Sequence, residues 1–159
     1  MELELNGVKL KVYESGEIHR LYKKDWVLRK GSINNCGYIK LRMKTKSLSA
    51  HRIVYKAFNP DWDILDLSRD NQIDHKNRIR NDNRLCNLRV ANHSQNQQNT
   101  NSKGYSWCNS SKRWRVRISR NKKEYTKKCK TEEEAIQASL EFRLKHFPFY
   151  ERTAIPEGE

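Results

Sequence analysis

Residues 73–99 contain three side chains whose chemistry suits the hydrolysis of a phosphodiester bond. Such hydrolysis requires an activated water, in-line geometry and a cation that stabilises charge on the phosphate and the leaving oxygen. His75, with an ordinary imidazole pKa of about 6.5, suits the general base at neutral pH. Asp74 offers a carboxylate and Asn96 an amide oxygen to one hard cation, leaving most coordination positions to water and phosphate, as magnesium prefers. We therefore expect one divalent metal, magnesium or manganese, on Asp74 and Asn96.

The same stretch also admits an interpretation without catalysis. An Asp-His pair is common, and a run rich in Asn and Gln is more often a solvated loop than a site. The polar residues 92–104 are either a linker or the polar face of an active site, and composition leaves both open. His93, three residues before Asn96, is an alternative metal ligand or a surface or phosphate-contacting histidine. Arg80 and Arg84 are expected to neutralise phosphate near the site.

Strands and one helix are predicted before this stretch. Residues 3–21 have the pattern of short strands, with turns at Asn6-Gly7 and Ser15-Gly16. Residues 37–43 alternate polar and apolar side chains, which predicts another strand. An amphipathic helix follows and ends before Pro60, because apolar and aromatic side chains recur at helical spacing: His51, Val54, Tyr55 and Phe58.

The stretch with the candidate site is predicted to form a strand, a loop, a second strand and a helix. The two short strands are residues 73–75 and 88–91. Asn92 or Ser94 is expected to cap the helix, because short polar side chains accept hydrogen bonds from the first free amides of a helix. That helix is predicted to continue through Thr100.

A small sheet and a helix are predicted in the C-terminal third. Residues 105–107, 114–118 and 125–129 have the pattern of three strands, with turns at 109–111 and 120–121. Thr131 is followed by three glutamates, which is the start of a capping box and so of a helix. The apolar face of that helix, which ends before Pro148, is expected to comprise Ala135, Ala138, Leu140 or Phe142, and Leu144.

Positive charge dominates the chain and is concentrated in this C-terminal third. Lys and Arg number 33 against 19 Asp and Glu, which gives a net charge of +14 and indicates a polyanionic partner, nucleic acid above all. Residues 103–130 carry eleven basic residues against one acid. Arg113, Arg115 and Arg117 share one face of the predicted middle strand, available to phosphates and bases. The alternative is that this face is only solvated charge that keeps the protein soluble.

Several other classes of protein and site are disfavoured. No segment approaches the roughly 18 apolar residues of a membrane-spanning helix, and the start MELELNGVKL lacks the apolar run of a signal peptide. We therefore expect a cytoplasmic protein with no membrane partner and no small-molecule cofactor, and a monomer. No structural zinc or disulfide framework is expected, because the cysteines are far apart and form no C-x-x-C pair: Cys36, Cys86, Cys108 and Cys129.

The residues around the candidate site resemble those of the HNH homing endonucleases of phages. The shared pattern is Asp74-His75, the loop 81–84, Asn87-Leu88-Arg89 and Asn96, preceded by the helical segment 50–58. The resemblance implies a ββα-metal (His-Me finger) fold, with His75 as base, Asp74 and Asn96 as metal ligands, and Asn87 bracing the loop that bears the histidine. It also implies a 3′ leaving oxygen, and the host cytoplasm as the location if the protein is phage-encoded.

Asn96 distinguishes this sequence from many members of that family, which have histidine at the last position of the motif. The motif of this chain is therefore a His-Asn-Asn variant. Because similar members of the phage branch cut or nick DNA with this variant, activity is expected. The preferred metal and the choice between nicking and double-strand cleavage are left open.

The C-terminal third resembles the DNA-binding domain of the plant ethylene-response (APETALA-type) factors. The shared elements are Gly104-Tyr105, the strand 114–118 and the helix that Thr131 opens. That family lays a three-stranded sheet in the major groove of DNA. The resemblance implies that the DNA-contacting residues are Arg113, Arg115, Arg117, Lys123 and Lys127.

We expect an α+β protein in two parts and a tail. Residues 1–100 are the predicted HNH nuclease domain, with strands and a helix in 1–60 and a ββα-metal core at about 72–100. Residues 101–150 are the predicted DNA-binding domain, a three-stranded antiparallel sheet packed on one helix, and residues 151–159 are the tail. The expected function is a metal-dependent endonuclease, of homing or nicking type, that acts on double-stranded DNA.

Two other functions are weighed against this expectation. The first is a sequence-specific DNA-binding regulator with an inactive nuclease core. The second is an RNA-binding basic protein, which is disfavoured because the sequence lacks the stacking-aromatic motif that is typical of RNA-binding modules.

Overall fold

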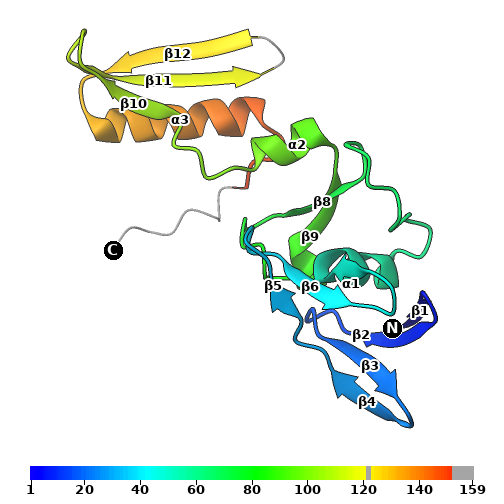
Figure 1. Cartoon of the computed structure of the whole chain (residues 1–159). Helices are drawn as coiled ribbons and strands as arrows, with labels where there is room; N and C mark the ends of the chain where they lie inside the picture. Colours follow the sequence, from blue (N-terminus) through cyan, green and yellow to red (C-terminus); the bar gives the residue numbers. More distant parts are fainter. Residues whose placement is uncertain (121–122, 152–159) are drawn as a thin grey trace. The chain divides into compact units, whose positions relative to one another are not determined.

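The computed structural model describes residues 1–120 and 123–151 of the chain and divides it into two compact units, residues 1–96 and 97–159. The predicted tail, apart from Glu151, and the second residue of the predicted turn at 120–121 lie outside the described residues. Several small sheets and a few helices make up the fold, which mixes α and β structure (Figure 1). In the described part of the chain, no helix has the length and apolar character needed to cross a membrane.

The first unit begins with a four-stranded antiparallel sheet. Its strands, in chain order and in spatial order, are β1 (Glu2–Leu5), β2 (Val8–Val12), β3 (Ile18–Tyr22) and β4 (Asp25–Leu28). The predicted hairpin turn is present, with φ of +51° at Asn6 and +67° at Gly7, the backbone that a two-residue turn of this kind requires. β4 follows a turn at Lys23 that the sequence analysis does not predict. Alternate residues of β2 are buried and supply one side of the core.

A second small sheet and the first helix pack on this layer. The sheet consists of β5 (Ser32–Ile33), β6 (Ile39–Arg42) and β7 (Ser47–Ser49), and α1 (Ala50–Phe58) follows directly. The α1 face that carries Ile53 and Val54, both fully buried, packs into the core of the unit. The helix ends before Pro60, as predicted, and the Asn59 side chain donates to the carbonyl of Tyr55 at 2.9 Å. Figure 1 shows α1 beside β6 and below β8 and β9.

The segment that carries the candidate site forms two antiparallel strands and a short helix. β8 (Gln72–His75) pairs with β9 (Leu88–Ala91), the 3-10 turn η1 (Leu85–Asn87) lies between them, and α2 (His93–Gln98) follows. Asn92 caps α2, because its Oδ1 accepts from the Gln95 amide at 2.8 Å while Gln95 Oε1 accepts from the Asn92 amide at 2.8 Å. The helix ends at Gln98, two residues earlier than predicted.

The second unit is a three-stranded antiparallel sheet with one helix along it. The strands β10 (Tyr105–Cys108), β11 (Arg113–Arg120) and β12 (Lys123–Cys129) lie in that order, and α3 (Glu132–His146) packs on one face (Figure 1). Thr131 caps the helix as predicted, with its Oγ1 accepting from the Glu134 amide at 3.2 Å, while the Glu134 side chain accepts from the Lys130 amide at 2.8 Å instead of from that of Thr131. Val116, Ile118 and Cys129 are buried against the helix.

The buried face of α3 differs from the predicted one at its C-terminal half. Leu144 is 49% exposed, whereas Arg143 is 4% exposed. The reason is the backbone of the segment before β10, whose carbonyls need donors: Arg143 donates to the Ser102 carbonyl at 2.6 Å, and Ser139 donates to that of Lys103 at 2.7 Å. The prediction of Leu144 at this face was therefore wrong, because apolar periodicity does not report backbone acceptors.

Candidate active site

His75, the last residue of β8, is almost fully buried, with 4% of its surface exposed. Its Nε2 lies 3.1 Å from Oδ1 of Asn83, which is itself 6% exposed. An amide oxygen only accepts hydrogen bonds, so in this arrangement Nε2 carries the ring hydrogen and Nδ1 retains the lone pair. The geometry therefore presents Nδ1 as the basic nitrogen of His75.

Aromatic side chains surround the His75 ring. The ring centroid of His51, on α1, lies 5.1 Å away with an edge-on geometry, and that of Tyr38 lies 5.8 Å away. Burial lowers the pKa of His75, and the hydrogen bond to Asn83 opposes this shift. Burial, followed by the charge of a protonated His75, lowers the pKa of His51 to about 3. Both rings are therefore neutral at neutral pH, as a proton acceptor must be.

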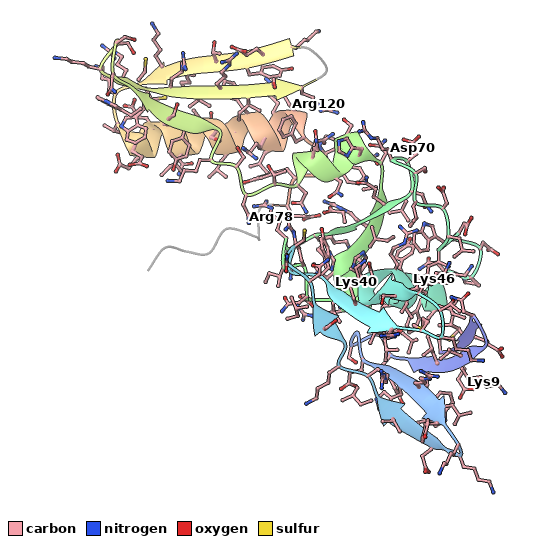
Figure 2. The ribbon with its side chains drawn as sticks, viewed as in Figure 1. Lys9, Lys40, Lys46, Asp70, Arg78 and Arg120 are labelled. Atoms are coloured by element: carbon pink, nitrogen blue, oxygen red, sulfur yellow. The ribbon has the colours of Figure 1, made fainter. Side chains whose placement is uncertain are left out.

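The His51 ring is fixed by packing, and its hydrogen bonding is incomplete. Within the described part of the chain, its Nδ1 has no hydrogen-bond partner. Lys40 of β6, labelled in Figure 2, donates to the hydroxyl of Ser49 at 2.7 Å just before α1 and adds positive charge near His51. Packing against Tyr38 at 5.2 Å and against His75 thus fixes the ring more than polar contacts do.

Asp74 has different partners from His75, as expected of consecutive residues in a strand. Its carboxylate is 5% exposed, and its Oδ2 accepts from both Nε and a terminal nitrogen of Arg89, each at 2.8 Å. Arg89 lies directly opposite Asp74 in the β8–β9 pair. The predicted metal ligand is therefore part of a nearly buried ion pair in this structure.

Asn96 lies on the same side of β8 as Asp74. Its Nδ2 donates to Oε1 of Gln72 at 2.8 Å. Gln72 and Asp74 are two residues apart and share one face of the strand, about 7 Å along it. Because Nδ2 makes this hydrogen bond, the amide is oriented and its Oδ1 faces away from Gln72.

A carboxylate and an amide oxygen are the donors that a hard cation with several water ligands prefers, so Asp74 and Asn96 fit a magnesium-type ion by their chemistry. Among the residues that the structure describes, no group of three or more His, Cys, Asp and Glu side chains is arranged to hold a metal. The metal site predicted from the sequence has two protein oxygen ligands. The assignment of both residues as ligands stays a prediction.

Asn87 connects the two ends of the loop that follows His75. Its Oδ1 accepts from the Asn77 amide at 2.9 Å, and its Nδ2 donates to the Asp82 carbonyl at 2.8 Å. Its own carbonyl accepts from the Lys76 amide at 2.8 Å. These contacts have the geometry that a bracing residue needs, and the role that the resemblance implies for Asn87 stays a prediction.

The two arginines predicted to contact phosphate lie on this loop with partners of their own. Arg84 makes two hydrogen bonds to the Asp82 carboxylate, at 2.8 and 2.7 Å, and this contact lowers the pKa of Asp82 to about 2. Arg80 donates to the Cys36 carbonyl at 2.9 Å and stacks over Tyr38. Both stay exposed enough to meet a polyanion, and their phosphate contacts stay predictions.

Sequence reasoning missed four residues of this site: Tyr38, His51 as a ring contact, Asn83 and Arg89. Asn83 and Arg89 lie within the quoted motifs, but the motifs give no reason to pair them with His75 and Asp74. The pairing of Arg89 with Asp74 follows from the strand register, which the sequence does not state. Tyr38 and His51 come from other elements, so only packing brings them to His75.

The basic face of the second unit consists of alternate β11 residues and their neighbours on β12. Arg113, Arg115 and Arg117 are exposed on one face, as predicted. Lys128 is the cross-strand partner of Arg115, whereas Lys127 is opposite Val116 and Lys123 is opposite Arg120.

Strand alternation therefore places Lys128, and neither of the two predicted lysines, beside the arginines. The DNA contacts of Lys123 and Lys127 that the resemblance implies stay predictions. Lys127 still borders a shallow pocket over this face, lined by Arg115, Arg117, Glu124, Thr126, Lys127 and Lys128. Arg117 is engaged by Glu124, with two contacts of 2.8 Å, so its charge is partly compensated.

Residues 49–98 match the family model described as HNH endonuclease. The match begins at the residue before α1 and ends with α2, so it contains Asp74, His75, Asn87 and Asn96. By this match the segment is similar to the HNH endonucleases. It occupies less than half of the chain, and both the N-terminal sheet and the second unit lie outside it.

The chain was also compared with solved structures and with curated proteins. The chain is similar to a solved structure titled "DNA binding and cleavage by the HNH homing endonuclease I-HmuI", with 22% identity and a TM-score of 0.44. The similarity covers 62% of this chain and 56% of that one, so the chain spans just over half the length of this relative. No curated protein matches the chain.

Asp74→Asn is expected to lower the free energy of unfolding by about 1–3 kcal/mol, because the nearly buried Arg89 then loses its ion pair with the Asp74 carboxylate. Urea denaturation of the parent and the variant measures this difference. Asp70→Asn is the matched control: Asp70 is exposed on the loop before β8 (Figure 2), and its replacement is expected to leave stability unchanged. If both substitutions changed the free energy of unfolding equally, the Asp74–Arg89 ion pair would not contribute to stability as proposed.

The free energy of unfolding is expected to fall as the pH decreases from 6.5 towards 3, because the unfolded chain takes up a proton at His51 that the folded chain excludes. Above pH 6.5 both states are neutral at this residue, and the effect vanishes. Urea denaturation across this window measures the slope, which is expected to be shallower in His51→Gln. The lowered pKa of His75 acts in the same direction and leaves a residual slope in the variant. An unchanged slope in His51→Gln would show that His51 is not the group responsible.

Proposed function

We propose that the protein is a metal-dependent DNA endonuclease that hydrolyses phosphodiester bonds in double-stranded DNA. One observation carries the proposal: within a segment that matches the HNH endonuclease family, a buried, neutral His75 is oriented with Nδ1 as its basic nitrogen. The net charge of +14 and the exposed arginine row of β11 support a nucleic-acid substrate. Homing or nicking is the proposed type of activity.

His75 is the proposed general base. Its Nδ1 takes a proton from a water molecule as that water attacks the phosphorus, and the apolar and aromatic surroundings keep the imidazole neutral until then. Asn83 holds Nε2–H, so the ring cannot turn its other nitrogen towards the water. Because His75 ends β8 and Asn87 ties the following loop, the base is carried on a braced backbone.

Asp74 and Asn96 are the proposed residues for one divalent cation, magnesium or manganese. When bound, such an ion stabilises negative charge on the phosphate and on the leaving oxygen. Asp74 contributes the charge and Asn96 a neutral oxygen, while the hydrogen bond to Gln72 fixes the Asn96 amide. Arg89 pairs with the Asp74 carboxylate, so a cation held by Asp74 would compete with Arg89 for that carboxylate.

The second unit is proposed to hold the duplex, with contacts from Arg113, Arg115, Arg117, Lys127 and Lys128. Phosphate contacts of this kind provide affinity and register, and arginine pairs with guanine edges provide specificity. The likeness of this unit to the APETALA-type domain stays a proposal, as do a monomeric state and a cytoplasmic location.

The Asp74–Arg89 ion pair also favours a second candidate function. A carboxylate already satisfied by arginine suits a DNA-binding regulator whose nuclease core does not cut. Direct measurement of manganese binding, by calorimetry or by electron paramagnetic resonance, separates the two. Binding that Asp74→Asn abolishes supports the nuclease, and its absence in the parent supports the regulator.

Cleavage of supercoiled plasmid in magnesium or manganese is expected to fall by about 10²–10⁴-fold in His75→Ala, which is the usual contribution of a general base. Gel electrophoresis of nicked and linear products measures the rate, and a chelator is expected to abolish it. His19→Ala, on β3, is the control and is expected to cleave as the parent does. A 5′-phosphate and a 3′-hydroxyl at the new ends are expected for a 3′ leaving oxygen. A parent that leaves the plasmid intact in every metal would refute the nuclease proposal.

Lys128→Ala is expected to reduce the salt dependence of duplex binding by about 0.9 in the slope of log affinity against log salt, because one phosphate contact is lost. Fluorescence anisotropy over a series of salt concentrations measures the slope. Lys123→Ala removes the same charge from the other side of the sheet and is expected to change the slope less. A larger effect of Lys123 would show that the sequence-based choice was the better one.

A further inference from the structure

The loop that carries Asn83 is in direct contact with the N-terminal sheet, which lies outside the matched endonuclease segment. Gly16 lies in the turn between β2 and β3, with φ of +89°. A Cβ added at Gly16 would lie 2.8 Å from the carbonyl carbon of Asn83 and 2.9 Å from its oxygen. Backbone therefore packs on backbone at this point, and a side chain at Gly16 has no flexible neighbour that could move aside.

A hydrogen bond reinforces this contact two residues away on each segment. The Leu85 amide donates to the Glu14 carbonyl at 2.9 Å. The turn itself is closed by the Tyr13 amide, which donates to the Glu17 carbonyl at 3.0 Å. The segment 83–85 is thus held against a hydrogen-bonded turn of the N-terminal sheet.

Asn83 connects this supported segment to His75 through its side chain. Its side chain is buried, at 6% exposure, and its Oδ1 is the acceptor that faces Nε2 of His75 at 3.1 Å. A displacement of the Asn83 backbone moves this oxygen with it, and the imidazole then loses the partner that fixes which of its nitrogens is basic and where that nitrogen points. Catalysis is sensitive to such displacements, since a shift of about 1 Å can cost about 10²-fold in rate.

We propose that Asn83 is the positioning residue of the general base, and that the Gly16 turn of the N-terminal sheet buttresses the catalytic histidine through it. The proposal rests on the proposed nuclease function for its catalytic consequence, while its structural content concerns His75, Asn83 and Gly16 alone. It gives the N-terminal sheet a role in the reaction that requires no contact with DNA. It also explains why this turn carries glycine, because both the positive φ and the absence of space exclude a side chain.

The first test is spectroscopic and needs no cleavage activity. A hydrogen-bonded, buried imidazole N–H exchanges slowly enough to give a separate proton resonance, which His75→Gln identifies by its loss. The resonance is expected in the parent and in Asn83→Asp, whose carboxylate still accepts from Nε2–H. It is expected to disappear in Asn83→Leu. Persistence of the resonance in Asn83→Leu would overturn the assignment of Asn83.

The second test concerns the Gly16 turn. Gly16→Ala is expected to weaken or remove the same resonance and to lower kcat for plasmid cleavage by about 10–100-fold with little change in KM. Gly7→Ala is the matched control: Gly7 also has positive φ, +67°, but an added Cβ there would meet only the flexible side chain of Lys44. Gly7→Ala is expected to keep the resonance and the rate.

The outcomes distinguish this proposal from the proposed function. An effect of Gly7→Ala equal to that of Gly16→Ala would overturn the buttress, because strain in the sheet would then account for both. A parent protein that shows the resonance but cuts no DNA would refute the nuclease function. The contact between Asn83 and His75 would then be tested by the resonance alone, through its loss in Asn83→Leu. Near-parental rate and resonance in Asn83→Asp, together with the loss of both in Asn83→Leu, support a positioning role over a merely structural one.

Discussion

The antiparallel pairing of β8 with β9 is the constraint on which the rest of the site depends. Its register places Asp74 opposite Arg89 and His75 opposite Leu88. The strand pleat then separates the side chains of Asp74 and His75, so the carboxylate contacts Arg89 while the imidazole packs against the rings of His51 and Tyr38. The end of β9 leads directly into α2, which carries Asn96 to the Gln72 side of β8. A shift of one residue in this register would exchange the surroundings of Asp74 and His75.

Burial acts in different ways on the two parts of the site. It keeps the His75 and His51 rings neutral, because an imidazolium in this aromatic surrounding would lose its hydration. The nearly buried Asp74 instead keeps a charge partner in Arg89. A neutral imidazole and a paired carboxylate thus lie on consecutive residues. The loop of residues 76–87 makes this separation stable, because Asn87 joins its two ends and Arg84 holds Asp82.

Much of the fold could be predicted from local pattern. The Asn6-Gly7 turn, α1 up to Pro60 and the Thr131 cap of α3 each depend on backbone preferences within a few residues, and all three are present. The alternation of arginine with Trp114, Val116 and Ile118 correctly gave the two faces of β11. Predictions failed where backbone carbonyls from a distant segment determine which side chain is buried. Arg143 is buried in place of Leu144 because the carbonyls before β10 need hydrogen-bond donors.

The residue types and their local spacing predict which side chains suit the chemistry: a histidine to take a proton, a carboxylate and an amide to hold a cation, and a row of arginines to contact a polyanion. Those properties belong to single residues and their near neighbours, so they are readable from spacing. The contacts of Asn83 with His75 and of Arg89 with Asp74 could not be predicted in this way. The same holds for the position of Lys128 opposite Arg115 and for the close approach of Gly16 to the loop. These relations arise from strand register and from contacts between segments far apart in the chain, where packing and hydrogen-bond satisfaction of the whole unit set the geometry.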